Sequence, residues 1–221
     1  MTQKIGRWFL PGFLLVSSIT LLVIGVPRFL AELMLVPGTP IYERVSKGEQ
    51  VSDEDLKVLE DSRLQALEFV ELPKAYTDLG TSYLVRAQRT DSAKERLEYA
   101  RRSIEVTTKG LNLAPLNTFA WLRLASANIL LGDQYSKKAV EGWRTSVATA
   151  RFEPFLLVQR LHIGIMLYNA MEPADIEVLK EQFQLTYRWN KHHLRAYSRQ
   201  MKLNEWMVFL AGENAEQAAF F

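Results

Sequence analysis

Three histidines are the side chains of this sequence best suited to acid–base or metal chemistry. His162 stands alone among apolar neighbours, which favours a hydrogen-bonded histidine at the edge of a core over a catalytic one. His192 and His193 are adjacent, so on a helix their rings diverge by about 100° and do not readily face one metal ion. We therefore expect no catalytic residue and no metal ligand among them.

Two other groups of polar residues resemble fragments of known sites. The acidic run Asp53 to Asp55 could begin a calcium loop, but Val58 occupies the sixth position, where such a loop needs glycine. Ser136 and Lys137 could form a hydrolase pair, but the sequence has no glycine-rich loop to stabilise an oxyanion. Both groups are typical of charged helix starts in solvent. The sequence predicts a non-catalytic protein with no cofactor.

A run of bases around an aromatic residue is the one candidate for direct binding. Arg188, Trp189 and Lys191 could contact an acidic protein partner, a phospholipid headgroup or a glycan. The alternative is a solvated turn with Trp189 packed in the core. We keep these three as candidate partner-binding residues.

The overall composition excludes several classes of protein. Among 221 residues, 48% are hydrophobic and 11% aromatic, which is sufficient to build a core and excludes a disordered chain. Lys and Arg number 27 against 25 Asp and Glu, so no strong field favours nucleic acid as a partner. The absence of cysteine excludes disulfides and thiolate-bound metals.

The apolar residues are concentrated near the N-terminus. Residues 8–26 hold 19 uncharged side chains, from Trp8 to Val26. A helix of that length reaches about 28 Å, which matches the bilayer core of about 30 Å. A signal anchor is the favoured interpretation, with a cleaved signal peptide and a buried core helix as alternatives. We assign residues 1–36 to a tail and transmembrane anchor, and residues 37–51 to a linker.

Orientation rests on the basic residues that flank this segment. Lys4 and Arg7 precede it, but Arg28, Arg44 and Lys47 follow it, so the count alone does not decide. The tail is short and lacks acids, which favours a cytoplasmic tail and a domain on the far side. The absence of cysteine is compatible with a bacterial periplasm. We expect a single-pass protein of the bacterial inner membrane, with its domain in the periplasm.

The rest of the chain carries helical spacing and helix-start signals. Capping patterns occur at Ser52 and Ser92, Asn117 opens a further helix, and Pro73 and Pro173 stand where first-turn prolines are tolerated. A last helix is expected from about 191 to 210. No segment alternates with period two, so no strand is predicted. The sequence predicts an all-α domain over residues 52–211, with a tail at 212–221.

One stretch of this domain resembles the tetratricopeptide repeat, a helix–turn–helix unit with a W-x2-L-G-x2-Y signature and a terminal proline. The matching positions are Tyr76, Leu79, Gly80, Tyr83, Pro115, Trp121, Leu124 and Ala125. The small residues Gly80 and Ala125 would let paired helices approach closely. The first copy is about eleven residues longer than the pattern, and the resemblance covers roughly residues 73 to 153.

The resemblance implies a short α-solenoid of antiparallel helix pairs that offers a concave face to another protein. Proteins similar to this are rarely catalysts, and their binding residues vary, so none is transferred to this chain. We expect a membrane-anchored scaffold or assembly subunit that binds a partner protein in a membrane or envelope complex. The alternative is a glycan- or lipid-binding accessory module of envelope polysaccharide synthesis or export.

Overall fold

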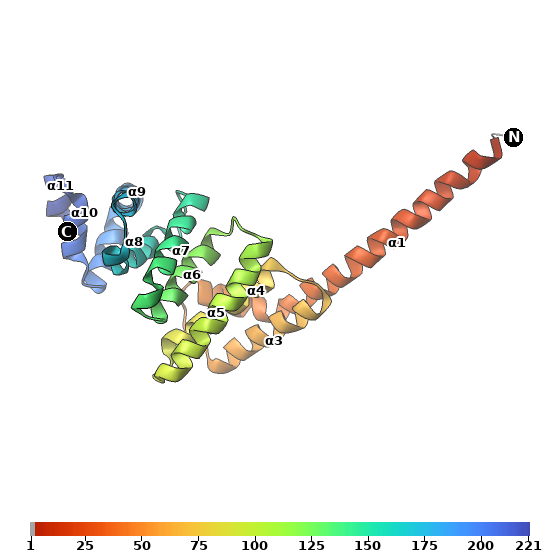
Figure 1. The fold of residues 1–221 in the computed structure, drawn as a ribbon, viewed down its shortest axis with the longest axis horizontal. Coiled ribbons are helices and arrows are strands. Elements are labelled where there is room, and N and C mark those ends of the chain that lie inside the picture. Colours follow the sequence, from red (N-terminus) through yellow and green to blue (C-terminus); the bar gives the residue numbers. More distant parts are fainter. Residues whose placement is uncertain (1–2) are drawn as a thin grey trace. The chain divides into compact units, whose positions relative to one another are not determined.

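A computed structural model describes residues 3–221 of the protein. Over this range the chain folds into helices without a strand, and 83% of it is helical (Figure 1). The predicted all-α class is confirmed, as is the long apolar helix at the N-terminus. Residues 1 and 2 of the predicted basic tail lie outside the described residues, as do the side chains of residues 3–10.

The helices follow one another through short connections. In chain order they are α1 (Gln3–Leu35), η1 (Val36–Gly38), α2 (Thr39–Ser46), α3 (Asp53–Phe69), α4 (Pro73–Arg89), α5 (Ala93–Leu113), α6 (Thr118–Leu130), η2 (Asp133–Tyr135), α7 (Ser136–Thr149), α8 (Leu157–Met166), η3 (Tyr168–Ala170), α9 (Pro173–Gln200), α10 (Asn204–Ala211) and α11 (Ala215–Phe220). The η elements are single 3-10 turns.

The chain divides into two compact units, Met1–Ser82 and Tyr83–Phe221. The boundary falls inside α4, which therefore begins in the first unit and ends in the second. The segment predicted as a linker, 37–51, contains the last two residues of η1 and all of α2, and it contributes buried residues such as Ile41 and Val51. The segment predicted as a tail, 212–221, contains α11.

Helix α1 is the one candidate membrane-spanning helix among the described residues. Its apolar window has a mean hydropathy of 2.1, and none of that window is buried. Large side chains such as Leu21 and Val23 expose 73% and 67% of their surface. Exposed apolar surface of this extent is stable in hydrocarbon rather than in water, which agrees with a helix that crosses a bilayer.

The C-terminal end of α1 is part of the first unit's core. Ala31 and Leu35 are buried against Ala66 of α3 and against Leu72 and Ala75. The helix thus continues without interruption from its exposed apolar stretch into the packed domain.

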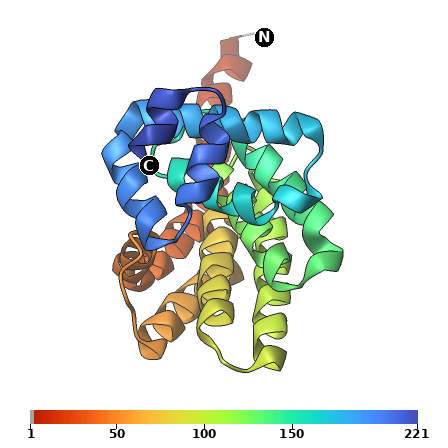
Figure 2. The same cartoon turned by 90° about the vertical axis from the view of Figure 1, so that its left-hand side faces the viewer.

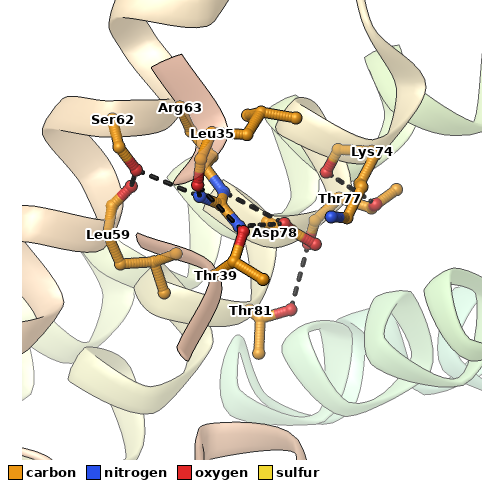
Figure 3. Close-up of polar contacts among 9 residues, drawn as sticks. All are labelled: Leu35, Thr39, Leu59, Ser62, Arg63, Lys74, Thr77, Asp78 and Thr81. Carbon is orange, nitrogen blue, oxygen red and sulfur yellow. Dashed lines mark hydrogen bonds and ion pairs between the residues drawn. The ribbon is translucent and has the colours of Figure 1, made fainter. Parts of the chain in front are cut away.

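A buried guanidinium fastens this end of α1 to the domain. Arg63 of α3 is completely buried; its Nε and Nη2 donate to Asp78 Oδ2 of α4 at 3.0 and 2.8 Å. Its Nη1 donates to the carbonyl of Leu35, the last residue of α1, at 2.6 Å (Figure 3). The Thr39 hydroxyl donates to the same carbonyl at 2.9 Å. We call Arg63, Asp78 and the Leu35 carbonyl the α1 lock.

The lock depends on a close approach of the backbone at Gly38. A Cβ atom there would lie 2.3 Å from Ser62 Oγ and 2.5 Å from Arg63 Nη1. Such distances are far below van der Waals contact, so a side chain at this position would displace the guanidinium. Figure 2 shows α3 and α4 side by side, and the Glu60 carboxylate, which accepts from the Ser82 hydroxyl at 2.5 Å, joins them a second time.

Several helix starts agree with the sequence signals. Ser52 and Asp55 form a reciprocal capping box at the start of α3, and Asn117 Oδ1 accepts from the Ala120 amide at the start of α6. Pro73 and Pro173 occupy the first positions of α4 and α9. At Ser92 the expected box is half formed, because Glu95 bonds to the Thr90 hydroxyl instead of the cap amide.

The second unit is built around Trp143 of α7. This side chain is fully buried and donates from its indole Nε1 to the carbonyl of Arg160 at 2.8 Å. Leu161, Leu179 and Phe183 complete the same cluster. The expected helix from 191 to 210 is wrong: α9 runs to Gln200 with a kink at Asn190, and a turn through Lys202, whose φ is 57°, separates it from α10.

A second buried guanidinium lies in this unit. Arg160 of α8 donates from Nε to Ser146 Oγ at 3.1 Å, from Nη1 to the carbonyl of Ala150 at 2.8 Å and from Nη2 to Thr118 Oγ1 at 2.5 Å. It also donates to the Ser146 carbonyl. Burial lowers the pKa of Arg160 to about 10, partly opposed by the charge of Glu153, so the group stays protonated at neutral pH. Arg160 therefore ties the start of α6 to the end of α7.

A candidate partner-binding groove

The surface of the second unit is hollowed between α5, α6 and α7. The groove has a volume of about 510 Å³, within the range of about 300–1,000 Å³ that is usual for binding sites. Its apolar lining includes the side chains of Ile104 of α5, Trp121 and Leu124 of α6, and Leu131. Such a lining suits apolar side chains of a bound segment.

Charged residues of both signs surround this apolar lining. Arg101 and Glu105 extend from α5, and Lys138 and Glu141 extend from α7. Lys138 Nζ lies 5.8 Å from the centre of the Tyr135 ring, which also lines the groove. Mixed charge at the rim matches a polar segment with apolar anchors better than a polyanion.

Close packing of α6 on α7 fixes the wall of the groove. A Cβ atom at Gly142 would lie 3.1 Å from both the Ala125 amide nitrogen and the Trp121 carbonyl oxygen, so the two backbones nearly touch. The start of α6 lies beside the end of α7, where the Thr118 hydroxyl donates to the Ser146 carbonyl at 2.7 Å, so the two helices are antiparallel. The groove is therefore largely pre-formed, which lowers the entropic cost of binding.

The residues that match the repeat signature lie in different environments. Leu124 lines the groove, and Ala125 makes the close approach to Gly142. Trp121 donates from Nε1 to the carbonyl of Pro115 at 2.7 Å, which fixes its ring beside the groove. In the first unit, Leu79 is 1% exposed and Gly80 is buried, while Tyr76 is half-buried and donates to Glu71 at 3.2 Å. Tyr83 is half-buried in the second unit.

The candidate residues Arg188, Trp189 and Lys191 lie at the kink of α9 and not at the groove. Trp189 exposes 46% of its surface, so it is not packed in the core. Arg188 Nε donates to the Gln184 carbonyl at 3.3 Å, and Lys191 Nζ lies 5.3 Å from the centre of the Phe220 ring. The Arg195 guanidinium approaches the same ring at 4.8 Å.

The histidines take part in local contacts. His162 Nδ1 lies 2.6 Å from the Tyr197 hydroxyl; burial lowers the pKa of His162 and raises that of Tyr197. His192 packs edge-on against Phe220, and His193 is exposed. Over the described part of the chain, no three His, Asp or Glu side chains gather in a way that could hold a metal ion.

Two buried arginines are the residues that sequence reasoning missed. Arg63 falls on the spacing of the apolar face of α3, between Leu59 and Ala66, and all three are buried. Arg160 falls in the same way between Leu157 and Gly164 on α8. The signal that could have identified them is a basic residue at a position that the apolar spacing of an amphipathic helix assigns to its buried face.

No model of a known protein family matches the chain, and no curated protein sequence matches it.

Proposed function

We propose that this protein is a membrane-anchored, non-catalytic scaffold subunit that binds a segment of a partner protein in the groove between α5, α6 and α7. The observation that carries the proposal is the groove itself, whose apolar lining and mixed-charge rim suit a peptide segment. We further propose that the helices form a short tetratricopeptide-like solenoid of antiparallel pairs. The exposed apolar length of α1 supports attachment to a membrane.

We place the protein in the bacterial inner membrane, with its domain on the periplasmic side and its partner in a membrane or envelope complex. Attachment to the bilayer confines the groove to a thin layer beside it. That confinement raises its effective concentration toward other membrane proteins, so contacts of modest affinity are sufficient. No nucleic acid is expected as a partner.

The test is purification of the full-length protein from native membranes with a single change in the groove. Leu124→Glu places a charge on the apolar lining and should reduce the amount of co-purified partner at least tenfold, which corresponds to about 1.4 kcal/mol. The matched control is Val208→Glu, which introduces the same charge on α10 at a side chain that is 43% exposed. Circular dichroism should show the same helix content in both variants.

The outcomes separate the proposal from its alternative. Loss of a stoichiometric partner in Leu124→Glu but not in Val208→Glu would support the groove. A partner retained by Leu124→Glu would contradict it. Glycan or lipid that co-purifies with the wild type and is lost when Arg188, Trp189 and Lys191 are replaced together would favour the accessory-module hypothesis.

A further inference from the structure

The C-terminal half of α9 and the turn after it carry a run of bases without any acid. Residues 182–204 contain no Asp or Glu. Five Lys and Arg residues lie in this stretch, Arg188, Lys191, Arg195, Arg199 and Lys202. The second unit, 83–221, holds 19 Lys and Arg against 14 Asp and Glu, so these five account for its whole net charge. We call them the α9 basic stripe.

Helical spacing places the central members of the stripe on one face. Lys191, Arg195 and Arg199 follow one another at steps of four after the kink at Asn190. Their side chains agree with this spacing, because Lys191 Nζ and the Arg195 guanidinium lie 5.3 and 4.8 Å from the centre of one ring, that of Phe220. Arg195 is half-buried, and the other four members are exposed.

The stripe has no counter-charge within the described part of the chain, because none of its members forms an ion pair there. Glu181, which precedes the stripe, is paired with Arg151 at 2.7 Å. Glu205, Glu213 and Glu216, which follow it, are exposed and approach none of its bases closely enough to pair. Like charges at steps of four repel one another. An anion from outside the chain would therefore stabilise this surface.

Two exposed apolar side chains indicate which kind of anion fits. Trp189 and Met201 lie next to members of the stripe and expose 46% and 40% of their surface. Tryptophan is enriched at the level of lipid headgroups, and a helix with bases beside exposed apolar residues is typical of the membrane interface. An acidic protein segment would compensate the bases without requiring apolar residues in water. The candidate membrane-spanning helix of the same chain keeps a bilayer within reach.

We propose that the α9 basic stripe binds the headgroups of anionic phospholipids at the bilayer surface. This inference rests on the membrane attachment proposed above and is independent of what the groove binds. Lys and Arg are attracted to such a surface within about a Debye length, roughly 10 Å at 0.1 M salt. The contacts exist only at a bilayer, so the lipid is a support for the second unit and not a cargo carried through detergent.

Quenching by lipid headgroups measures this contact in the full-length protein. Ala196, an exposed residue of the same stretch, is replaced by cysteine and labelled with a fluorophore, because the natural chain contains no cysteine. The protein is placed in nanodiscs that contain a lipid with a spin-labelled headgroup, in phosphatidylcholine alone or with phosphatidylglycerol. Quenching should be several-fold stronger with phosphatidylglycerol, and should lose that excess at about 1 M salt, where the Debye length is about 3 Å. Equal quenching in both lipids would overturn the proposal.

Two pairs of substitutions separate the stripe from net charge. Lys191→Gln with Arg199→Gln removes two of its bases, and Lys94→Gln with Lys137→Gln removes the same charge at exposed lysines of α5 and α7. The first pair should reduce the excess quenching several-fold, and the second should leave it unchanged. Equal effects of the two pairs, or no effect of the first, would contradict the stripe.

The remaining outcomes separate membrane attachment from the stripe and the bilayer from a protein. A wild type that does not enter nanodiscs would contradict membrane attachment, and the stripe proposal with it. Entry without a dependence on lipid charge would overturn the stripe alone. With a photo-crosslinking amino acid at Ala196, native membranes should yield no stoichiometric protein adduct. An adduct with an acidic protein would show that a protein, and not the bilayer, occupies the stripe.

Discussion

Each unit of this molecule buries an arginine whose guanidinium contacts the C-terminal end of another helix. The two units compensate the charge of that guanidinium differently. Arg63 donates to the last carbonyl of α1 and is paired with the carboxylate of Asp78. Arg160 donates to the Ser146 and Ala150 carbonyls at the end of α7 and to two hydroxyl groups. The carbonyls at a helix C-terminus carry partial negative charge and stabilise a cation in both places. Of these two arginines, only Arg63, which holds the end of α1, is also paired with a carboxylate.

This difference predicts which of the two arginines contributes more to the stability of the fold. Removal of Arg160 takes a donor from neutral groups only: the carbonyls of Ala150 and Ser146 and the hydroxyls of Ser146 and Thr118. Removal of Arg63 takes away the guanidinium that pairs with the buried carboxylate of Asp78. A buried charge that loses an ion pair costs more than dipoles that lose a hydrogen bond, because the desolvation of a charge is far more unfavourable. The end of α1 should therefore be the more sensitive of the two places.

Arg63→Met should have the largest effect. It removes the counter-charge of buried Asp78 and the donor to the Leu35 carbonyl, and we expect it to lower the free energy of unfolding by about 3–5 kcal/mol. Urea titration of the full-length protein in mild detergent, followed by circular dichroism, measures this loss. Adding Asp78→Leu removes the buried carboxylate as well and should recover part of the loss. If the double variant recovers no stability, the loss of the ion pair is not the main cause of the lower free energy of unfolding.

Arg160→Met should cost less. The Ala150 carbonyl loses its donor, but the Ser146 carbonyl keeps its bond from the Thr118 hydroxyl. We expect a loss of about 1–3 kcal/mol in the same titration. If this variant is as unstable as Arg63→Met, then it makes no difference to stability whether a carboxylate or helix carbonyls compensate the arginine.

Gly38→Ala probes the geometry of the α1 lock without touching its charges. The added methyl group would overlap Ser62 Oγ and Arg63 Nη1, and relief of that overlap should cost about 1–3 kcal/mol. Gly25→Ala is the matched control on α1, because nothing lies within 4 Å of its added Cβ. Equal stability of the two variants would contradict the close approach described for Gly38.

An ion pair between half-exposed Arg144 and buried Asp175 extends the comparison to the smallest expected effect. Arg144 donates to both oxygens of Asp175, which lowers the pKa of that carboxyl below its usual value of 3.8. The stabilisation is present above that value and is lost as pH falls through the lowered pKa. Because the Arg144 side chain is 49% exposed, solvent screens the pair, and Asp175→Asn should cost about 1 kcal/mol.

The pH dependence of this pair is measurable in the same way. Urea titrations between about pH 6 and about pH 3 should show a smaller loss of stability for Asp175→Asn than for the wild type. Asparagine keeps an acceptor for the Glu172 amide, which bonds to Asp175 Oδ2 at 3.1 Å, so the variant isolates the charge. Identical pH profiles would show that Asp175 does not contribute to acid sensitivity.

Local signals predicted more of this fold than of its site. Ser52, Asn117 and Pro173 mark helix starts because capping and first-turn geometry depend on residues within one turn. The break near Lys202 was missed, since neither glycine nor proline marks it. Its unusual φ is adopted by a lysine, which local propensity does not favour.

The α1 lock and the groove depend on helices that are distant in sequence. Arg63 and Asp78 belong to different helices, and the groove needs Ile104, Leu124 and Leu131 to meet from neighbouring elements. Spacing along one helix predicts which side chains share a face, but not which face of another helix they meet. The repeat resemblance brought Leu124 and Ala125 to notice, but the rim residues carry no motif.

The most direct test of the lock is a distance measurement within the first unit. The chain has no cysteine, so spin labels can be placed at Ile24→Cys on α1 and Asp61→Cys on α3, both exposed. The full-length protein, diluted with unlabelled copies in lipid nanodiscs, is measured by double electron–electron resonance. A single narrow distance distribution is predicted, because the lock makes α1 and α3 one rigid body. A broad distribution in the wild type would show that α1 is only flexibly attached to α3 and would contradict the lock.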